Sequence, residues 1–249
     1  YVPFTAVHIP IREPEAYLRR VPPTIEEPSL REYAACIIHL DEAVGKLLEV
    51  LEKSGKTSQT LVVFTSDNGG TTARNDDPAY PPDGYAPGRS GANNRPLKGN
   101  KGTVYEGGIR VPTVARWPGV LKPGKYVHPV HITDWMPTFC ALAGYRPEKP
   151  LKWDGENIWP FLTGAAEPSP RTIYTVGPSF RSVAIRDGDW KLIIHRATGP
   201  ESERVELYNL ASDPYEAEDQ AENRPEQVAM LKAKLEGVAA NDRDAVAEK

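Results

Sequence analysis

Cysteine and long hydrophobic runs are the two features that this sequence has least of. Its 249 residues include 2 cysteines, Cys36 and Cys140, which are too few for a disulfide framework and lack the spacing of a metal site. No stretch approaches the ~20 consecutive apolar residues that a membrane-spanning helix needs. The sequence therefore indicates neither a disulfide-rich scaffold, nor a cysteine-ligated metal, nor a membrane span.

Charge of one sign is also missing in any concentrated form. Lysine and arginine number 30 against 34 aspartate and glutamate residues, so the net charge is −4 and the pI is near 5.8. No basic cluster is large enough to indicate a nucleic-acid surface or an anionic membrane surface, and we expect neither partner. A hydrophobic content of 39% is that of an ordinary globular protein, which at this length forms one large domain or two small ones.

Proline, by contrast, is abundant, with 25 residues or roughly twice the average share. Many prolines gather in polar loops, and residues 71–97 form a long segment without hydrophobic periodicity. A segment of this length and composition is usually either a functional loop or disordered. Long proline-rich loops between short elements suit an enzyme whose site is built on loops over a rigid sheet.

The first part of the chain predicts one long helix and one buried strand. Ser29 and Glu32 have the spacing of a capping box. Apolar residues then recur at intervals of three and four until Gly55, which ends the helix: Tyr33, Ile37, Leu40, Val44, Leu47 and Leu51. Residues 60–66 form a nearly continuous apolar run, typical of a strand that is covered on both faces.

The middle of the chain predicts shorter elements. Residues 111–116 form a second apolar strand, and residues 156–162 form a short helix. Thr133 or Asp134 caps a further helix, which ends at Gly144.

The pattern changes near residue 168 and predicts a small antiparallel subdomain. Half-exposed strands are expected over residues 172–176, 182–186, 190–195 and 206–210, followed by an amphipathic helix over 225–238. Asp187-Gly188 between the second and third of these strands is a strong hairpin signal. We therefore expect one domain over residues 1–167 and a second over residues 168–249, whose charged tail after Asn241 is frayed.

Two adjacent oxygen-bearing side chains follow the first predicted strand. Asp67 and Asn68 stand directly after Thr65-Ser66 and before a pair of glycines. Carboxylate and amide oxygens at the carboxyl end of a strand favour ligation of a hard cation, because open α/β sheets place their sites there. Taken alone, the same residues are ordinary turn formers, so a simple turn is the alternative.

A glycine-rich segment about thirty residues later carries two lysines, Lys98 and Lys101. An ammonium group beside an ester of an oxyanion can bond a non-bridging oxygen and stabilise charge on the leaving oxygen. A loop lysine considered alone is usually only solvated. Hard-cation ligands together with ammonium donors nevertheless indicate a site for an oxyanion.

His8 lies just past the end of an N-terminal strand, in Val7-His8-Ile9-Pro10. Because its reference pKa is near neutrality, a histidine at this place can donate a proton to a departing alcohol oxygen, although a structural role is the alternative. We interpret His39, His128, His131 and His195 as structural, since the His128-x-x-His131 pair has no third ligand nearby in the sequence.

These segments together resemble the C-terminal half of the sulfatase family, the formylglycine-dependent sulfate-ester hydrolases. The matching stretches are Ala6–Pro10, Thr65–Gly70 and Lys98–Pro112, with weaker matches over Tyr33–Leu48 and Asp134–Gly144. The most specific part of the resemblance is Lys101–Arg110, and the whole of it covers about residues 1–215.

The resemblance implies a fold and a set of site residues. The fold is the alkaline-phosphatase-like α/β sandwich, of which this chain supplies the C-terminal part and a small antiparallel α+β subdomain. Lys101 and His8 are implied as catalytic and substrate-binding residues, Lys98 as a further substrate contact, and Asp67 and Asn68 as metal ligands. The implied metal is Ca²⁺, with Mg²⁺ second, because two-zinc phosphatases of this superfamily carry a histidine at the position of Asn68.

Two features of the family are absent from the sequence. The nucleophile motif Cys/Ser-x-Pro-x-Arg fits neither Cys36 nor Cys140, and the early paired aspartates are missing. We therefore interpret the chain as the C-terminal portion of a longer protein, with formylglycine in the N-terminal part, and expect this chain alone to be inactive. The resemblance alone favours a periplasmic or secreted location.

The expected substrate is a sulfated small molecule or a sulfated glycan, and loop 71–97 is expected to contribute to its specificity. Two alternatives remain: a phosphate mono- or diester hydrolase of the same superfamily, and a non-catalytic binding protein with this fold. Glu106 and Arg110 are either a pair that steadies the lysine loop or plain surface groups. Three tryptophans are interpreted as packing residues between the main domain and the subdomain: Trp153, Trp159 and Trp190.

Overall fold

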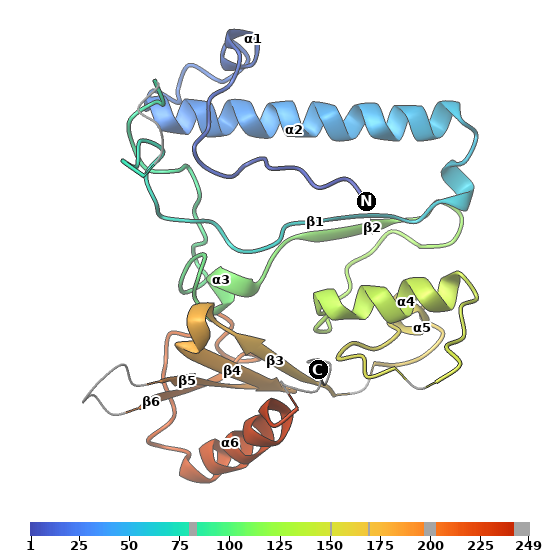
Figure 1. The fold of residues 1–249 in the computed structure, drawn as a ribbon, viewed down its shortest axis with the longest axis vertical. Helices are drawn as coiled ribbons and strands as arrows, with labels where there is room; N and C mark the ends of the chain where they lie inside the picture. The colour runs from blue at the N-terminus through green and yellow to red at the C-terminus, as the bar shows by residue number, and fades with distance from the viewer. Residues whose placement is uncertain (80–83, 150, 169, 197–202, 242–249) are drawn as a thin grey trace, which may run out of the picture. The chain divides into compact units, whose positions relative to one another are not determined.

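The structure is a computed structural model that describes residues 1–79, 84–149, 151–168, 170–196 and 203–241. The chain divides into two compact units, Tyr1–Val114 and Ala115–Lys249 (Figure 1). The tail expected to fray after Asn241 lies outside the described residues. Within the described ranges, no helix combines the length and the apolar character that crossing a membrane requires.

The first unit is dominated by the long helix α2 (Pro28–Lys53), which follows the single turn of α1 (Glu15–Leu18) (Figure 1). Gly55 follows it with a φ of +70°, so the predicted end of the helix is confirmed. The 3₁₀ turn η1 (Thr57–Gln59) leads from the helix towards the next strand.

The predicted capping box is wrong. The helix begins with Pro28 in its first turn, where the missing N–H costs nothing, and its N-cap Glu27 makes no side-chain cap. Ser29 is buried instead, with Oγ 2.6 Å from Glu27 Oε1 and 2.7 Å from the carbonyl oxygen of Arg89. Glu32 accepts a hydrogen bond from the backbone N–H of Glu13 at 2.6 Å, so both residues serve tertiary contacts.

The strand over residues 60–66 is confirmed as β1 (Val62–Thr65), which pairs with β2 (Thr113–Arg116). Its expected burial on both faces is wrong, because Phe64 is 41% exposed and Val114 is 60% exposed. The sheet has two strands in the described part of the chain, so neither strand has neighbours on both sides. The buried cluster of this unit forms elsewhere, around Ile9, Ile11 and Cys36.

The second unit begins with short helices and ends with an antiparallel sheet. The helical elements are η2 (Ile132–Asp134), α4 (Trp135–Leu142), α5 (Trp159–Leu162), η3 (Pro178–Phe180) and α6 (Pro225–Ala239). The strands are β3 (Thr172–Val176), β4 (Ser182–Asp187), β5 (Trp190–His195) and β6 (Arg204–Asn209), in the order β3-β4-β5-β6. Neighbouring strands run antiparallel, and Gly188 turns the predicted hairpin with a φ of +58°.

One face of this sheet packs against α6 (Figure 1). The cluster joins Val183, Ile185, Leu192, Ile194 and Leu207 of the sheet to Leu231 and Leu235 of the helix. The other face carries a buried ion pair between Lys191 and Glu216, 2.7 Å apart. The expectation of half-exposed strands is therefore wrong for β4 and β5, since both of their faces are covered.

Two of the three tryptophans, Trp159 and Trp190, pack against residues of this second unit. Trp190 is partly buried against the core between the sheet and α6, and Arg224 lies 5.1 Å from its ring centroid. Trp159 packs on Trp117, with 5.4 Å between the ring centroids, while Trp153 is 38% exposed. Their expected place between two domains stays a prediction.

Asp134 links the helical part of the second unit to its sheet. Its carboxylate is fully buried and accepts two hydrogen bonds from Arg171, at 2.5 and 2.8 Å. It also accepts the backbone N–H groups of His131 at 2.7 Å and Glu156 at 3.1 Å. Burial would lower the pKa of Arg171, but the hydrogen bond and charge of Asp134 outweigh burial and raise that pKa.

Asp134 therefore caps η2 through the His131 backbone, rather than capping α4 directly with its side chain. The helix that follows ends before Gly144, whose φ is +73°, as predicted. Because Arg171 precedes β3, this cluster spans the domain boundary expected at residues 167–168, which stays a prediction.

The substitution Asp134→Ala should lower the free energy of unfolding by about 3–5 kcal/mol, because the largely buried guanidinium of Arg171 loses its bidentate partner and keeps only the longer 3.4 Å contact with Glu156. Chemical denaturation followed by circular dichroism measures the change. The control is Glu42→Ala, which removes the exposed ion pairs with Arg20 and Lys46 and should have a much smaller effect. Equal losses in the two variants would contradict the role given to Asp134.

Candidate active site

The end of β1 and the lysine loop are joined through their backbones. The N–H of Gly69 donates to the carbonyl of Gly108 at 2.9 Å, and the N–H of Lys101 donates to the carbonyl of Gly70 at 3.0 Å. The loop closes on itself through a 2.7 Å bond from the N–H of Gly107 to the carbonyl of Lys98. These bonds bring the chain that follows Asp67 and Asn68 to the chain that carries Lys101.

This approach is possible only with glycine at residues 69 and 107. A Cβ atom on Gly69 would lie 1.8 Å from the carbonyl oxygen of Gly107. A Cβ atom on Gly107 would lie 2.5 Å from the carbonyl oxygens of both Lys98 and Gly99. The two glycines are thus required by contact between distant segments, and no positive φ is involved.

Two asparagines that the sequence did not single out hold the same junction. Asn94 donates to the carbonyl of Gly70 at 2.9 Å and accepts the N–H of Gly70 at 2.8 Å, as a neighbouring strand would. Asn100 donates to Thr72 Oγ1 at 2.8 Å. Asparagine in a loop rich in glycine and proline resembles a turn former, so no pattern in the sequence distinguished either residue.

The structure brings Lys101 and His8 together, although 93 positions separate them. Lys101 Nζ lies 2.9 Å from His8 Nε2, and His8 Nδ1 lies 2.5 Å from the carbonyl oxygen of Ile9. A carbonyl only accepts, so Nδ1 carries the ring hydrogen and Nε2 offers its lone pair to the ammonium group. Both side chains are exposed, where a ligand can reach them.

Asp67 and Asn68 stand at the end of β1, as expected. Asp67 is exposed, and its Oδ1 accepts the N–H of Asn68 at 2.9 Å. Asn68 donates its amide N–H to the carbonyl of Gly69 at 2.9 Å, which leaves its oxygen as the donor atom for a cation.

The two oxygens suit a hard cation, but Ca²⁺ takes six to eight ligands. Among the residues described, no three side chains of the His, Cys, Asp or Glu type come together as a metal site. The residues present therefore fit one part of a site for a hard cation.

The remaining residues around the lysine loop have distinct surroundings. The ammonium group of Lys98 lies 4.6 Å from the ring centroid of Tyr105, so its role as a substrate contact stays a prediction. Glu106 begins the single turn α3 (Glu106–Ile109) and is buried, whereas Arg110 is exposed. A paired role for these two side chains also stays a prediction.

The other histidines contact protein groups, in keeping with a structural role. His39 lies 2.8 Å from Glu13 Oε2 and stacks on Tyr17 with 3.9 Å between the ring centroids. His131 contacts Thr133 Oγ1 at 2.9 Å, and burial lowers the pKa of His131. His128 lies beside Tyr126, with 5.5 Å between the ring centroids, and His195 Nε2 lies 3.6 Å from Glu206 Oε2.

Cys36 is poorly suited to act as a nucleophile. Its side chain is buried in the cluster with Ile9 and Ile11. Burial, reinforced by a hydrogen bond to Glu13, raises the pKa of the Cys36 thiol to about 12. Since the reactive form is the thiolate, this cysteine is inert near neutral pH.

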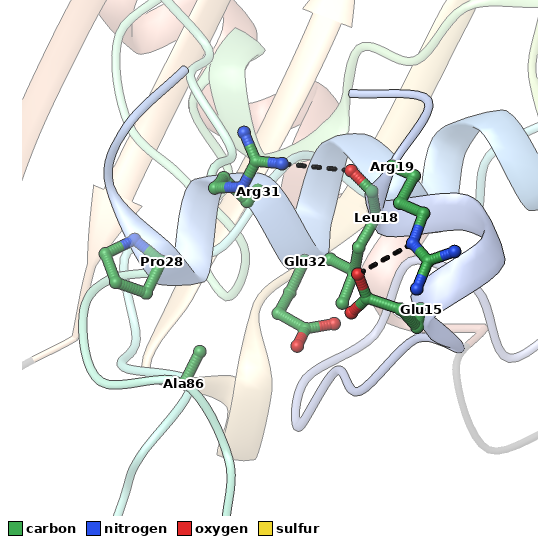
Figure 2. A pocket seen from close by; sticks show the side chains of 7 residues that line it. All are labelled: Glu15, Leu18, Arg19, Pro28, Arg31, Glu32 and Ala86. Carbon is green, nitrogen blue, oxygen red and sulfur yellow. Dashed lines mark hydrogen bonds and ion pairs between the residues drawn. The ribbon is translucent and has the colours of Figure 1, made fainter. Parts of the chain in front are cut away.

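A cavity of about 300 Å³ lies beside α1 and the start of α2 (Figure 2). Some of its lining residues contact one another: Arg31 donates to the carbonyl of Leu18 at 3.0 Å, and Arg19 pairs with Glu15 at 3.1 Å. The remaining lining residues are Pro28, Glu32 and Ala86, so none of the predicted site residues faces this cavity.

The end of β1 meets the glycine-rich lysine loop, and His8 contacts Lys101, on an α/β protein. Two family models match the chain: Sulfatase over residues 1–145, and N-sulphoglucosamine sulphohydrolase, C-terminal, over residues 99–241. The chain belongs to the sulfatase family.

The curated relatives are sulfatases of bacteria and mammals. Mouse arylsulfatase J is 27% identical over 279 residues, and a sulfatase of Formosa agariphila is 30% identical over 262 residues. Each match covers 94% of this chain and 44% of the relative. Human arylsulfatase A is 37% identical over 160 residues, covering 62% of this chain and 29% of its own. The chain thus spans less than half the length of these relatives.

Solved structures confirm the fold. The crystal structure of Ps i-CgsB matches with a TM-score of 0.79 and 32% identity, covering 94% of this chain and 48% of that one. The phosphonate monoester hydrolase of Agrobacterium radiobacter matches with a TM-score of 0.55 and 25% identity, covering 85% of this chain and 41% of that one. The fold is the alkaline-phosphatase-like α/β fold predicted from the resemblance.

The substitution Gly69→Ala should separate the strand end from the lysine loop, because the new methyl group would overlap the carbonyl oxygen of Gly107. We expect a loss of about 1–3 kcal/mol in the free energy of unfolding and faster amide hydrogen exchange at Lys101. Gly45→Ala is the control: a Cβ in the middle of α2 meets no atom within 4 Å, so stability should rise by about 0.5–1 kcal/mol. Unchanged exchange at Lys101 in Gly69→Ala would show that the contact is dispensable.

Proposed function

We propose that the protein containing this chain hydrolyses sulfate esters to an alcohol and sulfate. The observation that carries the proposal is the 2.9 Å contact between Lys101 Nζ and His8 Nε2 at the exposed edge of a sulfatase-family fold. It puts an ammonium group and an imidazole ring within reach of one ester group. Membership of the sulfatase family supports the choice of sulfur over phosphorus.

Lys101 would bind a non-bridging oxygen of the sulfate group. Its backbone N–H is tied to Gly70, so the loop that presents the ammonium group is ordered before the substrate arrives. The same charge would stabilise the negative charge that builds up as the ester bond breaks.

His8 would supply the proton that the departing alcohol needs. Without substrate, Nε2 accepts a hydrogen bond from Lys101. With the sulfate group on Lys101, His8 would hold a proton at Nε2 beside the leaving oxygen. Neither Cys36 nor Cys140 lies in the motif that yields formylglycine, so a formylglycine elsewhere in the protein would supply the attacking oxygen.

Asp67 and Asn68 would hold one side of a Ca²⁺ ion, with Mg²⁺ as the second choice. The support is the chemistry of the donors, a carboxylate and an amide oxygen, which suits a hard cation better than zinc. When bound, such an ion neutralises charge on the sulfate oxygens.

The substrate we propose is a sulfated glycan or a sulfated small molecule. Ps i-CgsB, which is 32% identical to this chain, has a crystal structure in complex with k-i-k-neocarrahexaose, and this supports the glycan. Choline-sulfatase of Rhizobium meliloti is 32% identical over 203 residues, which supports the small molecule.

A phosphate or phosphonate ester hydrolase is the second candidate. The observation in its favour is the fold shared with a phosphonate monoester hydrolase. Against it stands Asn68, which occupies the place of a histidine in two-zinc phosphatases and offers oxygen where zinc favours nitrogen.

In the full protein, Lys101→Ala and His8→Ala should each lower kcat/KM by a factor on the order of 10²–10⁴, the usual effect of losing an oxyanion donor or a general acid. His8→Ala should harm an alkyl sulfate more than a nitrophenyl sulfate, because the poorer leaving group depends more on protonation. His39→Ala is the control and should leave the chemistry nearly unchanged. Equal losses for the two substrates in His8→Ala would refute the proton-donor role.

Elemental analysis of the full protein should find Ca²⁺, and Asp67→Ala should weaken its binding, because a carboxylate ligand is lost. The control is Asp41→Ala, which removes an exposed carboxylate from α2 and should leave the metal content unchanged. Oxygen–metal distances of about 2.3–2.6 Å would identify calcium, and about 2.0–2.1 Å magnesium. Two equivalents of zinc that restore activity, with calcium ineffective, would favour the phosphatase candidate.

A further inference from the structure

Asn75 joins the polar loop to the segment that carries His8. Its side chain is 1% exposed, and its Oδ1 accepts the backbone N–H of Ile11 at 2.6 Å. Its Nδ2 donates to the carbonyls of Ile11 at 3.1 Å and Ala86 at 3.2 Å. The amide oxygen and the amide nitrogen are therefore both engaged inside the protein, and both backbone groups of Ile11 are satisfied by one side chain.

The backbone that Asn75 binds also determines where the ring of His8 lies. Ile9 and Ile11 are each 4% exposed and belong to the same buried cluster. His8 directs its Nδ1 hydrogen to the carbonyl of Ile9, so the orientation of the ring follows the backbone at Ile9. A shift of this short segment would move Nε2 away from Lys101.

Backbone hydrogen bonds within the loop hold the main chain of Asn75 in place. The N–H of Asn75 donates to the carbonyl of Gly88 at 2.8 Å, and the N–H of Ser90 donates to the carbonyl of Ala73 at 2.9 Å. Between these bonds, Arg74 and Arg89 form an isolated antiparallel bridge. The loop is thus anchored by its own backbone, and the Asn75 side chain extends from that anchor to Ile11.

We propose that Asn75 is a positioning residue for His8, which keeps the imidazole against Lys101. The two most similar side chains do not replace it. Aspartate lacks the N–H that donates to the carbonyl of Ile11, and glutamine is one methylene too long for the buried space that Asn75 occupies. The catalytic consequence rests on the proposed function, whereas the geometric consequence does not.

The first test measures geometry without turnover. Imidazole ¹⁵N shifts of the full protein, with His8 assigned from a His8→Gln variant, should show one neutral tautomer with hydrogen on Nδ1. In Asn75→Ala the shifts of His8 should move to the average of two tautomers. The matched control is Ser29→Ala, which loosens the same loop from α2 and keeps the bonds to Ile11. An unchanged His8 tautomer in Asn75→Ala overturns the proposal, whether or not the protein hydrolyses sulfate esters.

The second test is a double-mutant cycle on kcat/KM with an alkyl sulfate. Asn75→Ala should cost a factor of about 10–10² in the wild-type background, the scale expected for misplacing a reactive group by about 1 Å. In the His8→Ala background the cost should fall below about threefold, because the residue to be positioned is gone. An equal cost in both backgrounds overturns the proposal, and Ser29→Ala should show no dependence on His8.

A milder variant keeps the proposal testable if Asn75→Ala does not fold. Asn75→Asp keeps an acceptor for the N–H of Ile11 and removes the donor to its carbonyl. Its His8 imidazole shifts and its kcat/KM should both lie between those of the wild type and those expected for Asn75→Ala. Wild-type behaviour of Asn75→Asp in both measurements also overturns the proposal.

Discussion

The contact of Gly69 with Gly107 and Gly108 is the constraint on which the whole site depends. It sets the backbone after Asp67 and Asn68 directly against the loop of Lys101, at a separation that leaves no room for a β-carbon. Hydrogen bonds across the contact then hold the two segments in one register. The segment that follows the oxygen donors and the segment that carries Lys101 meet because two stretches of glycine backbone can touch. A site of this kind is specified by residues that carry no chemistry of their own.

Elements with a strong internal pattern could be predicted from the sequence. The apolar face of α2, the strands β3 to β6 and the Asp187-Gly188 turn depend on neighbours within a few residues. The local sequence pattern therefore predicted them. The capping box failed because Ser29 and Glu32 bond residues far along the chain, at Arg89 and Glu13, and Pro28 starts the helix without them. The burial of β1 was misjudged because an apolar run predicts a covered strand only where a sheet supplies the cover.

The site itself shows the same division. His8, Asp67, Asn68 and Lys101 were predicted as site residues because their types and local motifs match a known family, and the structure places two of them, His8 and Lys101, in contact. Asn75 and Asn94 were missed, since their partners are 64 and 24 positions away and asparagine is common in loops for unrelated reasons. Reactive groups have recognisable types, whereas the residues that orient them are recognised only by what they touch.

The buried pair of Asp134 and Arg171 has a consequence for how this architecture can evolve. The carboxylate belongs to the helical part of the second unit, and its counterion Arg171 directly precedes the strand that opens the antiparallel sheet. A lineage that lost or exchanged the sheet alone would keep a charged group at zero exposure without its partner. Positions 134 and 171 should therefore change together among related sequences, and the sheet should be inherited together with the helices.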